Sequence, residues 1–329
     1  MALAPNSGFH ALPNELLQYI WYYAPRECSR VISAVCAYWR SVSLDTPSLW
    51  SRVTVSPLVP EEWLKAQLAR SGQHPLTIDI RFALIYEPDE DFTAKVDAIT
   101  RLTTLLSAYL DRCQVLRISL DEPEHDEALN ELDVLDERRD RAGTAITAPL
   151  RDIPAPRLQE LHINARFISD CCGQLLLDGM PVLTHLFLGL DTRTSAHDNG
   201  HLPEETDFVA YVLRRVRSVT HMWVGDCTPY VQMLEPEWEP TEQEEAPCPK
   251  LESLTWLSIQ ARAYPQYDTI RSVIDGRASF GVPLRKFRVS RQAVDKIREE
   301  DRAGLLAKSE LELFDSEEEK AILKEKWMW

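Results

Sequence analysis

The sequence is poor in several features that particular classes of protein need. Glycine is scarce, with 11 residues among 329, whereas proline is frequent, with 21. This imbalance argues against the glycine-rich loops of nucleotide-binding sheets and favours many short elements that end at prolines. No apolar run approaches the roughly 18 residues that a membrane-spanning helix needs, and the N-terminus lacks the basic start and apolar stretch of a signal peptide. We therefore expect a protein of the cytoplasm, the nucleus or both, with no membrane partner.

Basic residues are also fewer than acidic residues. The chain has 36 Lys and Arg residues against 52 Asp and Glu residues, which gives a formal net charge of -16. A surface of this charge repels a phosphate backbone, so we expect no nucleic-acid partner. The seven cysteines are odd in number and lack the CxxC or Cys/His spacing of a zinc site. We expect them to be reduced thiols that bind no metal.

Motifs that carry chemistry are missing from the sequence. It contains no GxSxG, GxGxxG, GxxxxGK[ST] or HExxH pattern, and the histidines are scattered. Cys171 and Cys172 are adjacent, which does not suit the usual spacing of two zinc ligands. We therefore expect no catalytic residues, no cofactor and no metal. A hydrolase with dispersed catalytic residues, built on the histidines, is the less favoured alternative.

The first 55 residues are crowded with large apolar side chains. Pro13 suits the first turn of a helix, and Leu12, Leu16 and Ile20 then fall four residues apart on one face. Val31, Ile32, Val35 and Trp39 recur at helical spacing in a second run, and Pro47 interrupts the pattern before Leu49 and Trp50. These patterns predict three short helices in a first domain at residues 8–55.

This domain is too small to bury all of its apolar side chains. A domain of about 60 residues buries only about 60% of the surface of its unfolded chain. Some of the large apolar residues must therefore face a neighbour, which is either the rest of this chain or a second protein.

The same residues resemble the F-box family. The segments LPNELLQYI, VISAVCAYWRSV and DTPSLW are similar to its Leu-Pro-x-Glu-Leu start, its Val-Cys-x-x-Trp-Arg centre and its closing Pro-x-Leu-Trp. The resemblance implies a three-helix domain that docks on the Skp-type adaptor of cullin-type ubiquitin ligases. Cys28 departs from the pattern, because the family usually has a leucine there. The positions that match, and that the resemblance assigns to adaptor binding, are Leu12, Pro13, Glu15, Leu16, Ile20, Val35, Cys36, Trp39, Leu49 and Trp50.

A second pattern repeats through the rest of the chain. The segments PRLQELHI, PVLTHLFL and PKLESLTW share the form Pro-x-Leu-x-x-Leu-x-apolar, and looser versions begin at Val219 and Leu284. The pattern resembles an irregular leucine-rich repeat, which implies a solenoid whose units each add one short parallel strand. Residues 115–120 and 76–80 are candidates for earlier strands. We expect a mixed α/β fold, with this repeat domain at residues 56–308 and a capping strand or helix at residues 309–329.

Residues between the buried positions of each strand point to the other face, because successive residues of a strand alternate sides. Exposed aromatic residues and arginine in such a row are typical of protein interfaces, whereas aromatics packed under a loop are the alternative. The candidate substrate-binding row is His162, Phe187, Trp223, Thr255 and Arg288, flanked by Glu160, His185, His221, Ser253 and Lys286.

Two acidic stretches, at residues 121–141 and 235–245, have the composition of solvated surface insertions. Attraction of a basic substrate is their alternative role. Near the C-terminus, Ser316 and Glu319 have capping-box spacing and precede Ile322, Leu323 and Trp327. We expect a helix here that either caps the last repeat or binds a partner.

Together these patterns predict a non-catalytic substrate receptor of a Skp-cullin-F-box ubiquitin ligase. Its expected partners are a Skp-type adaptor, through it a cullin, and an unknown protein substrate. The alternative with the same fold is an interaction scaffold without a ligase role, whose apolar helices pack on its own repeats.

Overall fold

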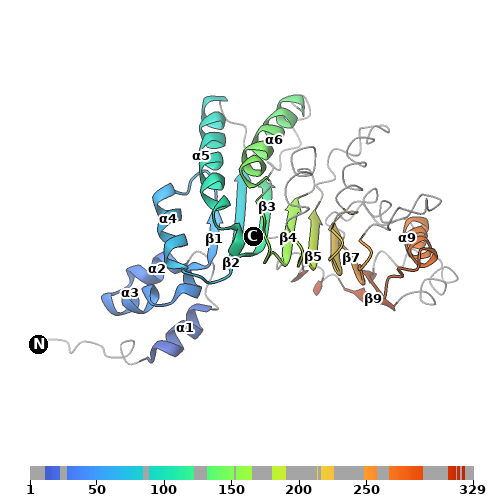
Figure 1. Ribbon diagram of the computed structural model, residues 1–329, viewed down its shortest axis with the longest axis horizontal. Coiled ribbons are helices and arrows are strands. Elements are labelled where there is room, and N and C mark those ends of the chain that lie inside the picture. Colours follow the sequence, from blue (N-terminus) through green and yellow to red (C-terminus); the bar gives the residue numbers. More distant parts are fainter. Residues whose placement is uncertain are drawn as a thin grey trace, which may run out of the picture.

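The chain folds into an N-terminal helical bundle followed by a long parallel sheet with helices beside it (Figure 1). This arrangement comes from a computed structural model, which describes residues 12–22, 28–83, 89–121, 132–151, 153–164, 180–189, 213, 216–225, 248–257, 267–291, 310–315, 317–318 and 321–322.

The bundle consists of three short helices and a single 3-10 turn. The helices are α1 (Asn14–Tyr22), α2 (Cys28–Ala34) and α3 (Ala37–Leu44), and the turn is η1 (Pro47–Trp50). The prediction of three N-terminal helices is therefore confirmed. Leu17, Trp21, Ile32 and Val42 are buried together in a small core that is separate from the core of the sheet.

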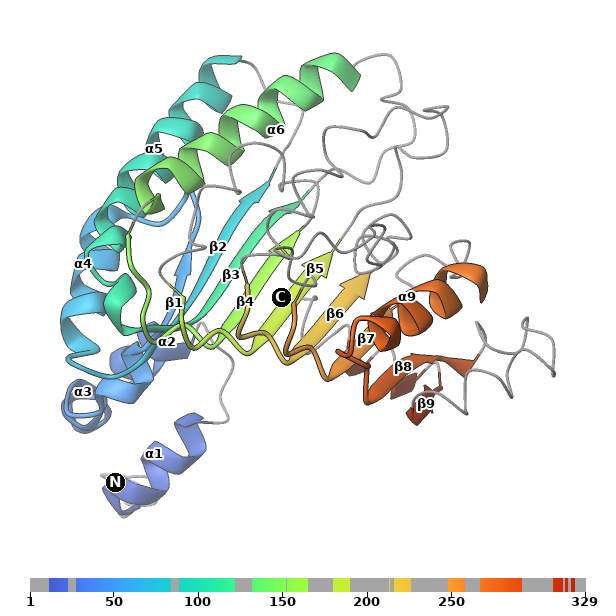
Figure 2. The ribbon, with the colours of Figure 1, turned by 45° about the vertical axis from the view of Figure 1, so that its right-hand side comes forward.

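In the described residues, nine strands form one sheet in which all neighbours are parallel and the spatial order follows the chain order. Figure 2 shows the sheet as a curved array. The strands are β1 (Arg52–Val55), β2 (Leu76–Ala83), β3 (Cys113–Asp121), β4 (Glu160–Asn164), β5 (His185–Gly189), β6 (His221–Gly225), β7 (Ser253–Leu257), β8 (Lys286–Ser290) and β9 (Glu310–Phe314).

One face of the sheet packs against helices because its residues alternate along each strand. Leu161 of β4, Leu186 and Leu188 of β5, and Trp256 of β7 are buried in the same core as residues of the helices. The helices are α4 (Glu61–Arg70), α5 (Asp89–Ser107), α6 (Leu132–Thr147) and α9 (Tyr267–Ser279), and short 3-10 turns occur at η2 (Leu110–Arg112) and η4 (Ala148–Leu150). We call the opposite face of the sheet the open-side face.

The mixed α/β fold with a parallel sheet is confirmed, and every repeat segment contains the start of a strand. The prediction did not include β1, which pairs with β2 and lies within the predicted first domain at residues 8–55. The segment 309–329 contributes β9 to the sheet edge. The leucine-rich-repeat assignment and the domain boundaries remain predictions.

The first acidic stretch is not simply a surface insertion. Residues 132–141 belong to α6, whose Ala142, Ala145 and Ile146 enter the core. The Arg138 guanidinium is almost buried and lies 5.2 Å from the centroid of the Phe92 ring. The prediction was wrong here because the acidic residues of the helix give this stretch the composition of a solvated insertion, although other residues of the same helix are buried. The second acidic stretch, residues 235–245, lies outside the described residues.

Within the described ranges, no helix combines the length and the apolar character that crossing a membrane requires.

Candidate interaction surfaces

Helix α1 presents different apolar residues to its two sides. Leu17 and Trp21 are four residues apart and point into the bundle core. Leu16 and Ile20 have the same spacing but lie one position earlier, which turns them outward, and they remain 49% and 52% exposed. The helix is therefore apolar on its outer side as well as its inner side.

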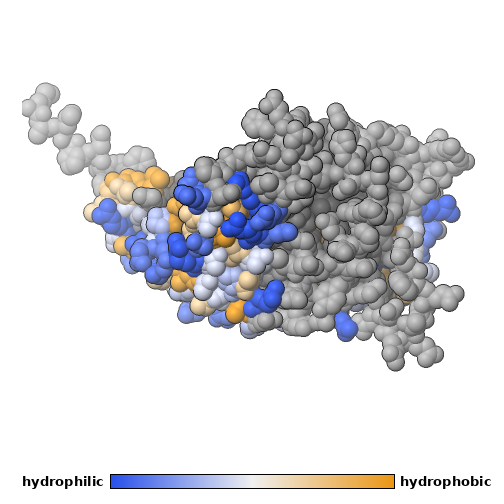
Figure 3. Space-filling view, turned by 90° about the horizontal axis from the view of Figure 1, so that it is seen from above, coloured by the Kyte–Doolittle hydropathy of each residue, from blue (hydrophilic) through white to orange (hydrophobic). Residues whose placement is uncertain are grey.

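Helix α2 repeats this arrangement. Ile32 is buried in the bundle core, whereas Val31 and Val35, four residues apart, are exposed. Eight large apolar side chains are exposed in the described part of the chain, and six of them belong to the bundle: Leu16, Tyr19, Ile20, Val31, Val35 and Leu44. Figure 3 shows apolar patches at the left end of the molecule, where Figure 1 places the bundle. We call Leu16, Tyr19, Ile20, Val31 and Val35 the bundle's outer apolar face.

Polar contacts fix the helices that carry this face. The Tyr38 hydroxyl lies 3.0 Å from the Leu12 carbonyl oxygen and 2.8 Å from Asn14 Oδ1, which ties α3 to the start of α1. Gln18 Nε2 donates to Thr46 Oγ1 at 3.1 Å. These hydrogen bonds therefore link α1 to α3 and to the residue before η1 within the chain.

Several residues that the resemblance assigns to adaptor binding are outward-facing. Pro13, Glu15, Leu16, Ile20 and Val35 are exposed. They lie on or beside the outer apolar face, so the structure leaves them accessible to a partner.

Other assigned residues are at least partly used inside the bundle. Cys36 caps the N-terminus of α3, because its Sγ accepts a hydrogen bond from the Trp39 amide at 3.4 Å. The Trp39 ring meets the Trp21 ring edge-on at 5.6 Å between centroids. Leu12 and Leu49 are half-buried against the bundle core. These four residues therefore make contacts inside the bundle.

Trp50 requires a correction, because its side chain is fully buried within its own chain. Its indole nitrogen donates to the Ser43 carbonyl oxygen at 2.7 Å, its ring meets the Trp63 ring of α4, and the Arg70 guanidinium lies 4.6 Å from its centroid. Trp50 therefore joins the bundle to the sheet and is not an accessible partner-binding residue. Position in a motif could not reveal this, because Trp63 and Arg70 lie beyond it.

The open-side face carries one continuous row of side chains across the strands. The strand register places Asp79, Arg117, His162, Phe187, Trp223, Thr255, Arg288 and Glu312 side by side. The repeat pattern predicted the five positions from His162 to Arg288 in this order. It did not reveal Asp79, Arg117 or Glu312, because their strands lack the repeat motif.

Flat rings stack in the middle of this row, because neighbouring strands lie only about 4.8 Å apart. The His162 and Phe187 ring centroids are 3.7 Å apart, and those of Phe187 and Trp223 are 4.2 Å apart. His185 and His221 stack beside them at 4.9 Å. We call His162, Phe187, Trp223, His185 and His221 the aromatic ladder.

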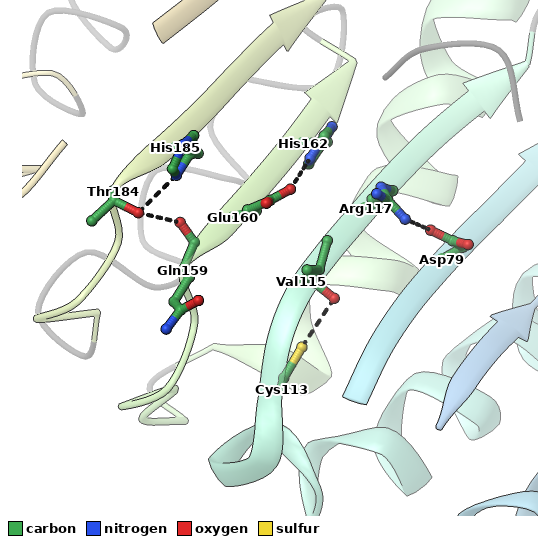
Figure 4. Close-up of polar contacts among 9 residues, drawn as sticks. All are labelled: Asp79, Cys113, Val115, Arg117, Gln159, Glu160, His162, Thr184 and His185. Atoms are coloured by element: carbon green, nitrogen blue, oxygen red, sulfur yellow. Dashed lines mark hydrogen bonds and ion pairs between the residues drawn. The ribbon is translucent and has the colours of Figure 1, made fainter. Parts of the chain in front are cut away.

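Hydrogen bonds orient the imidazoles of the aromatic ladder. Thr184 Oγ1 lies 2.8 Å from His185 Nδ1, and Thr220 Oγ1 lies 2.9 Å from His221 Nδ1. His162 Nε2 is 3.4 Å from the Glu160 carboxylate. Figure 4 shows the side chains of Glu160 and His162 on β4, of His185 on β5 and of Thr184 just before β5, together with the Asp79–Arg117 pair.

Ion pairs flank the aromatic ladder on both sides. Arg117 pairs with Asp79 at 3.1 Å, and both side chains are buried. At the other end, Glu312 accepts from Lys286 and lies 3.3 Å from Arg288 Nε. The hydrogen bond from Lys286, helped by the charge of Arg288, lowers the pKa of the Glu312 carboxyl below its ordinary value.

The expectation of an exposed substrate-binding row is wrong for three of its residues. His162, Phe187 and Thr255 are buried, at 2%, 0% and 1% exposed. Trp223 and Arg288 are half-buried. Alternation along the strands correctly predicted the face on which these side chains lie, but it could not show whether that face is covered.

Two cysteine thiols, those of Cys113 and Cys248, are buried. Burial raises the pKa of Cys113 and of Cys248 to about 12, so both remain protonated at neutral pH. Within the described residues, no group of three His, Cys, Asp or Glu side chains is placed to hold a metal ion.

Arg277 is buried against the Cys248 carbonyl oxygen, to which it donates at 3.0 Å, and burial lowers its pKa. The hydrogen bond from Arg277 to the Cys248 carbonyl oxygen links α9 to the turn before β7.

Residues 9–56 match the F-box-like family model. The match covers α1 to β1, including the outer apolar face, and it ends one residue after β1. No curated protein matches the chain. The N-terminal bundle is thus similar to F-box-like domains, which generally bind Skp-type adaptors.

Proposed function

We propose that this protein is a non-catalytic substrate receptor of a Skp-cullin-F-box ubiquitin ligase in the cytoplasm or nucleus. The outer apolar face of an F-box-like domain is the observation that carries the proposal. Apolar side chains clustered on a stable domain are typical of a surface that another protein covers. That partner is a Skp-type adaptor, which links the chain to a cullin.

The open-side face of the sheet is the proposed target-binding region. Its central row includes Trp223 and Arg288, both half-buried, and these are residue types that contribute strongly to protein interfaces. Ubiquitin transfer then takes place in the partners. The receptor acts by proximity, because holding target and ubiquitin carrier in one assembly raises their effective concentration.

The contacts by which Trp50 connects α3 to α4 support this mode of action. Three contacts of its side chain reach α3 and α4, and Gln67 of α4 donates to the Arg52 carbonyl oxygen at 2.7 Å. The bundle is therefore anchored to the first strand of the sheet. A fixed spacing between adaptor and target is what a proximity mechanism needs.

Co-purification of the full chain with a Skp-type adaptor tests the proposal. We compare the wild type with a Leu16→Ala plus Ile20→Ala variant. Burying one such side chain fully contributes about 1.5–3 kcal/mol, and each is half exposed before binding, so the loss is about 2 kcal/mol or roughly 30-fold in affinity. A Leu58→Ala plus Val182→Ala variant is the matched control, because both side chains are exposed outside the bundle.

We expect the wild type and the control to capture the adaptor and the bundle variant to lose most of the capture. Equal capture by all three would refute the assigned surface. Absence of capture by the wild type would refute the ligase role and favour the interaction scaffold.

A further inference from the structure

The edge of the sheet at which the strands begin carries exposed basic side chains. Figure 2 shows the starts of β2 to β6 along the lower edge of the sheet. The turns that lead into β4 to β8 contain five charged residues, all of them exposed, and only Glu252 among the five is acidic. These turns are residues 153–159, 180–184, 216–220, 248–252 and 280–285. We call the four basic residues of the turns the basic edge: Arg157, Arg217, Lys250 and Arg285.

The charge of the basic edge is opposite to that of the chain. The whole chain has a formal net charge of -16, whereas four positive charges and one negative charge leave these turns at +3. Salt screens the repulsion from distant acidic residues more than the attraction of a nearby basic residue. A local positive region of this kind attracts anionic groups of a partner.

The basic side chains keep hydrogen-bond donors for such a partner. Among the described residues, no oxygen atom accepts a hydrogen bond from Arg157 or Lys250. Arg285 lies 3.8 Å from the Glu252 carboxylate, and the two side chains are 77% and 49% exposed. Because an exposed pair of this length contributes little stability, a carboxylate of a partner can replace Glu252 at Arg285.

Hydrogen bonds between successive turns fix the backbone that carries the basic edge. The Gln159 carbonyl oxygen accepts from the amides of Thr184 and His185, both at 3.0 Å, and the carbonyl oxygens of Thr184, Thr220 and Glu252 accept from the next turn in the same way. A backbone held in this manner loses little freedom when a partner binds, which lowers the entropic cost of binding. Each turn is also anchored by one apolar residue in the core of the sheet: Leu158, Leu183, Val219, Leu251 and Leu284.

The spacing of the basic edge fits a short extended segment. Neighbouring strands lie about 4.8 Å apart, so the four steps from the turn before β4 to the turn before β8 span about 19 Å. An extended chain advances about 3.3 Å per residue and directs alternate side chains to the same side, so about six residues cover this distance. Acidic residues at alternate positions of such a segment would all face the basic edge.

We propose that the basic edge binds an acidic segment of a partner protein, in an extended conformation with carboxylates at alternate positions. Arg157, Lys250 and Arg285 supply the positive charges that hold it. A nucleic acid or an anionic membrane carries dense negative charge over an area larger than this edge, so the net charge of -16 repels it. A protein segment with a few carboxylates meets less of this repulsion. The proposed surface does not rest on the ligase role.

Peptide binding to the full chain tests the proposal. The probe is a fluorescent peptide that alternates glutamate and serine over about seven residues, and its anisotropy is measured at low salt, where exposed charges act most strongly. We compare the wild type with an Arg157→Gln plus Lys250→Gln variant. The matched control is Lys65→Gln plus Arg101→Gln, which removes the same charge from exposed positions on α4 and α5.

We expect the edge variant to bind the acidic peptide about fivefold more weakly than the wild type, which is the combined effect of two exposed ion pairs. The control should bind within about twofold of the wild type, because its substitutions lie away from the basic edge. Equal affinities of the wild type and the edge variant, equal losses in the edge variant and the control, or absence of binding to the wild type would overturn the proposal.

A charge-preserving variant separates loss of charge from disturbed folding. Arg157→Lys plus Lys250→Arg keeps both positive charges, so we expect it to bind the acidic peptide like the wild type. Weak binding of this variant, with an unchanged midpoint of thermal unfolding, would contradict recognition by charge.

Three further probes test the class of partner. They are a peptide that alternates lysine and serine, a short DNA duplex and anionic lipid vesicles. We expect each to bind more weakly than the acidic peptide. Tighter binding of the duplex or the vesicles, lost in the edge variant, would overturn the assignment to a protein segment.

Adaptor capture is a separate measurement. We expect the edge variant to capture a Skp-type adaptor like the wild type, because its substitutions lie outside the bundle. Failure of the wild type to capture the adaptor would refute the ligase role and leave the peptide prediction unchanged, whereas failure to bind the acidic peptide would refute only the basic edge.

Discussion

The bundle and the sheet place their apolar side chains in opposite ways. On the bundle, Leu16, Ile20 and Val35 are about half exposed, although the domain that carries them has its own core. On the sheet, one face is buried under helices and even Phe187, on the other face, is fully covered. The bundle therefore presents apolar side chains that a partner can contact, whereas the side chains at the centre of the row on the sheet are buried.

Removing the Trp50 contacts between the bundle and α4 should have the largest effect on the free energy of unfolding. Trp50→Ala removes a fully buried ring that contacts Ser43, Trp63 and Arg70. We expect it to lower the free energy of unfolding by about 3–5 kcal/mol, measured by urea denaturation. A loss below about 1 kcal/mol would show that the joint does not depend on this side chain.

Two neighbouring leucines sharpen the comparison within one helix. Leu17 is buried in the bundle core, whereas Leu16 is half exposed. Leu17→Ala should cost about 2–4 kcal/mol of folding free energy, because it leaves a cavity. Leu16→Ala should change it by less than about 0.5 kcal/mol, although it weakens adaptor binding. Thermal unfolding of the two variants measures the difference, and equal losses would contradict the assignment of inner and outer sides.

The buried ion pair tests how strongly the open-side face is covered. Asp79→Asn keeps the shape of the side chain but leaves the charge of Arg117 without its carboxylate at 3.1 Å. We expect a loss of about 2 kcal/mol in the free energy of unfolding, because the bond is charge-assisted and buried. Since an exposed pair is worth much less, a loss under about 0.5 kcal/mol would mean that water reaches this end of the row.

Acid should affect the last two strands only slightly. The pKa of Glu312 is lowered in the folded chain from its ordinary value of 4.5, so the carboxylate adds stability above that pH. This contribution is lost as the pH falls through the lowered value. Because Glu312 is partly exposed, we expect it to amount to less than about 1 kcal/mol. Urea denaturation at pH 7 and pH 3 measures it: Glu312→Gln should reduce the pH dependence, and an identical dependence would argue against the contact.

Local sequence patterns predicted the elements that depend on apolar spacing. The three N-terminal helices and the repeated strands follow from side chains that recur every three to four, or every two, residues. β1 was missed because its four residues, RVTV, adjoin the bundle and contain no repeat motif. α6 was missed because its acidic outer side resembles a solvated loop.

The candidate surfaces were predictable only in part, because exposure depends on contacts between distant segments. The surplus of apolar residues in the bundle correctly predicted that some of them face outward. The burial of Trp50 depends on Trp63 and Arg70, and that of Phe187 depends in part on the rings of His162 and Trp223 on neighbouring strands. Neither can be inferred from the local segment.

Hydrogen–deuterium exchange of the full chain, alone and with a Skp-type adaptor, tests the central claim most directly. If the outer apolar face is the docking surface, the adaptor should slow amide exchange in α1 and α2 and leave β4 to β6 unchanged. Unchanged exchange in both helices, or protection confined to the sheet, would contradict the account.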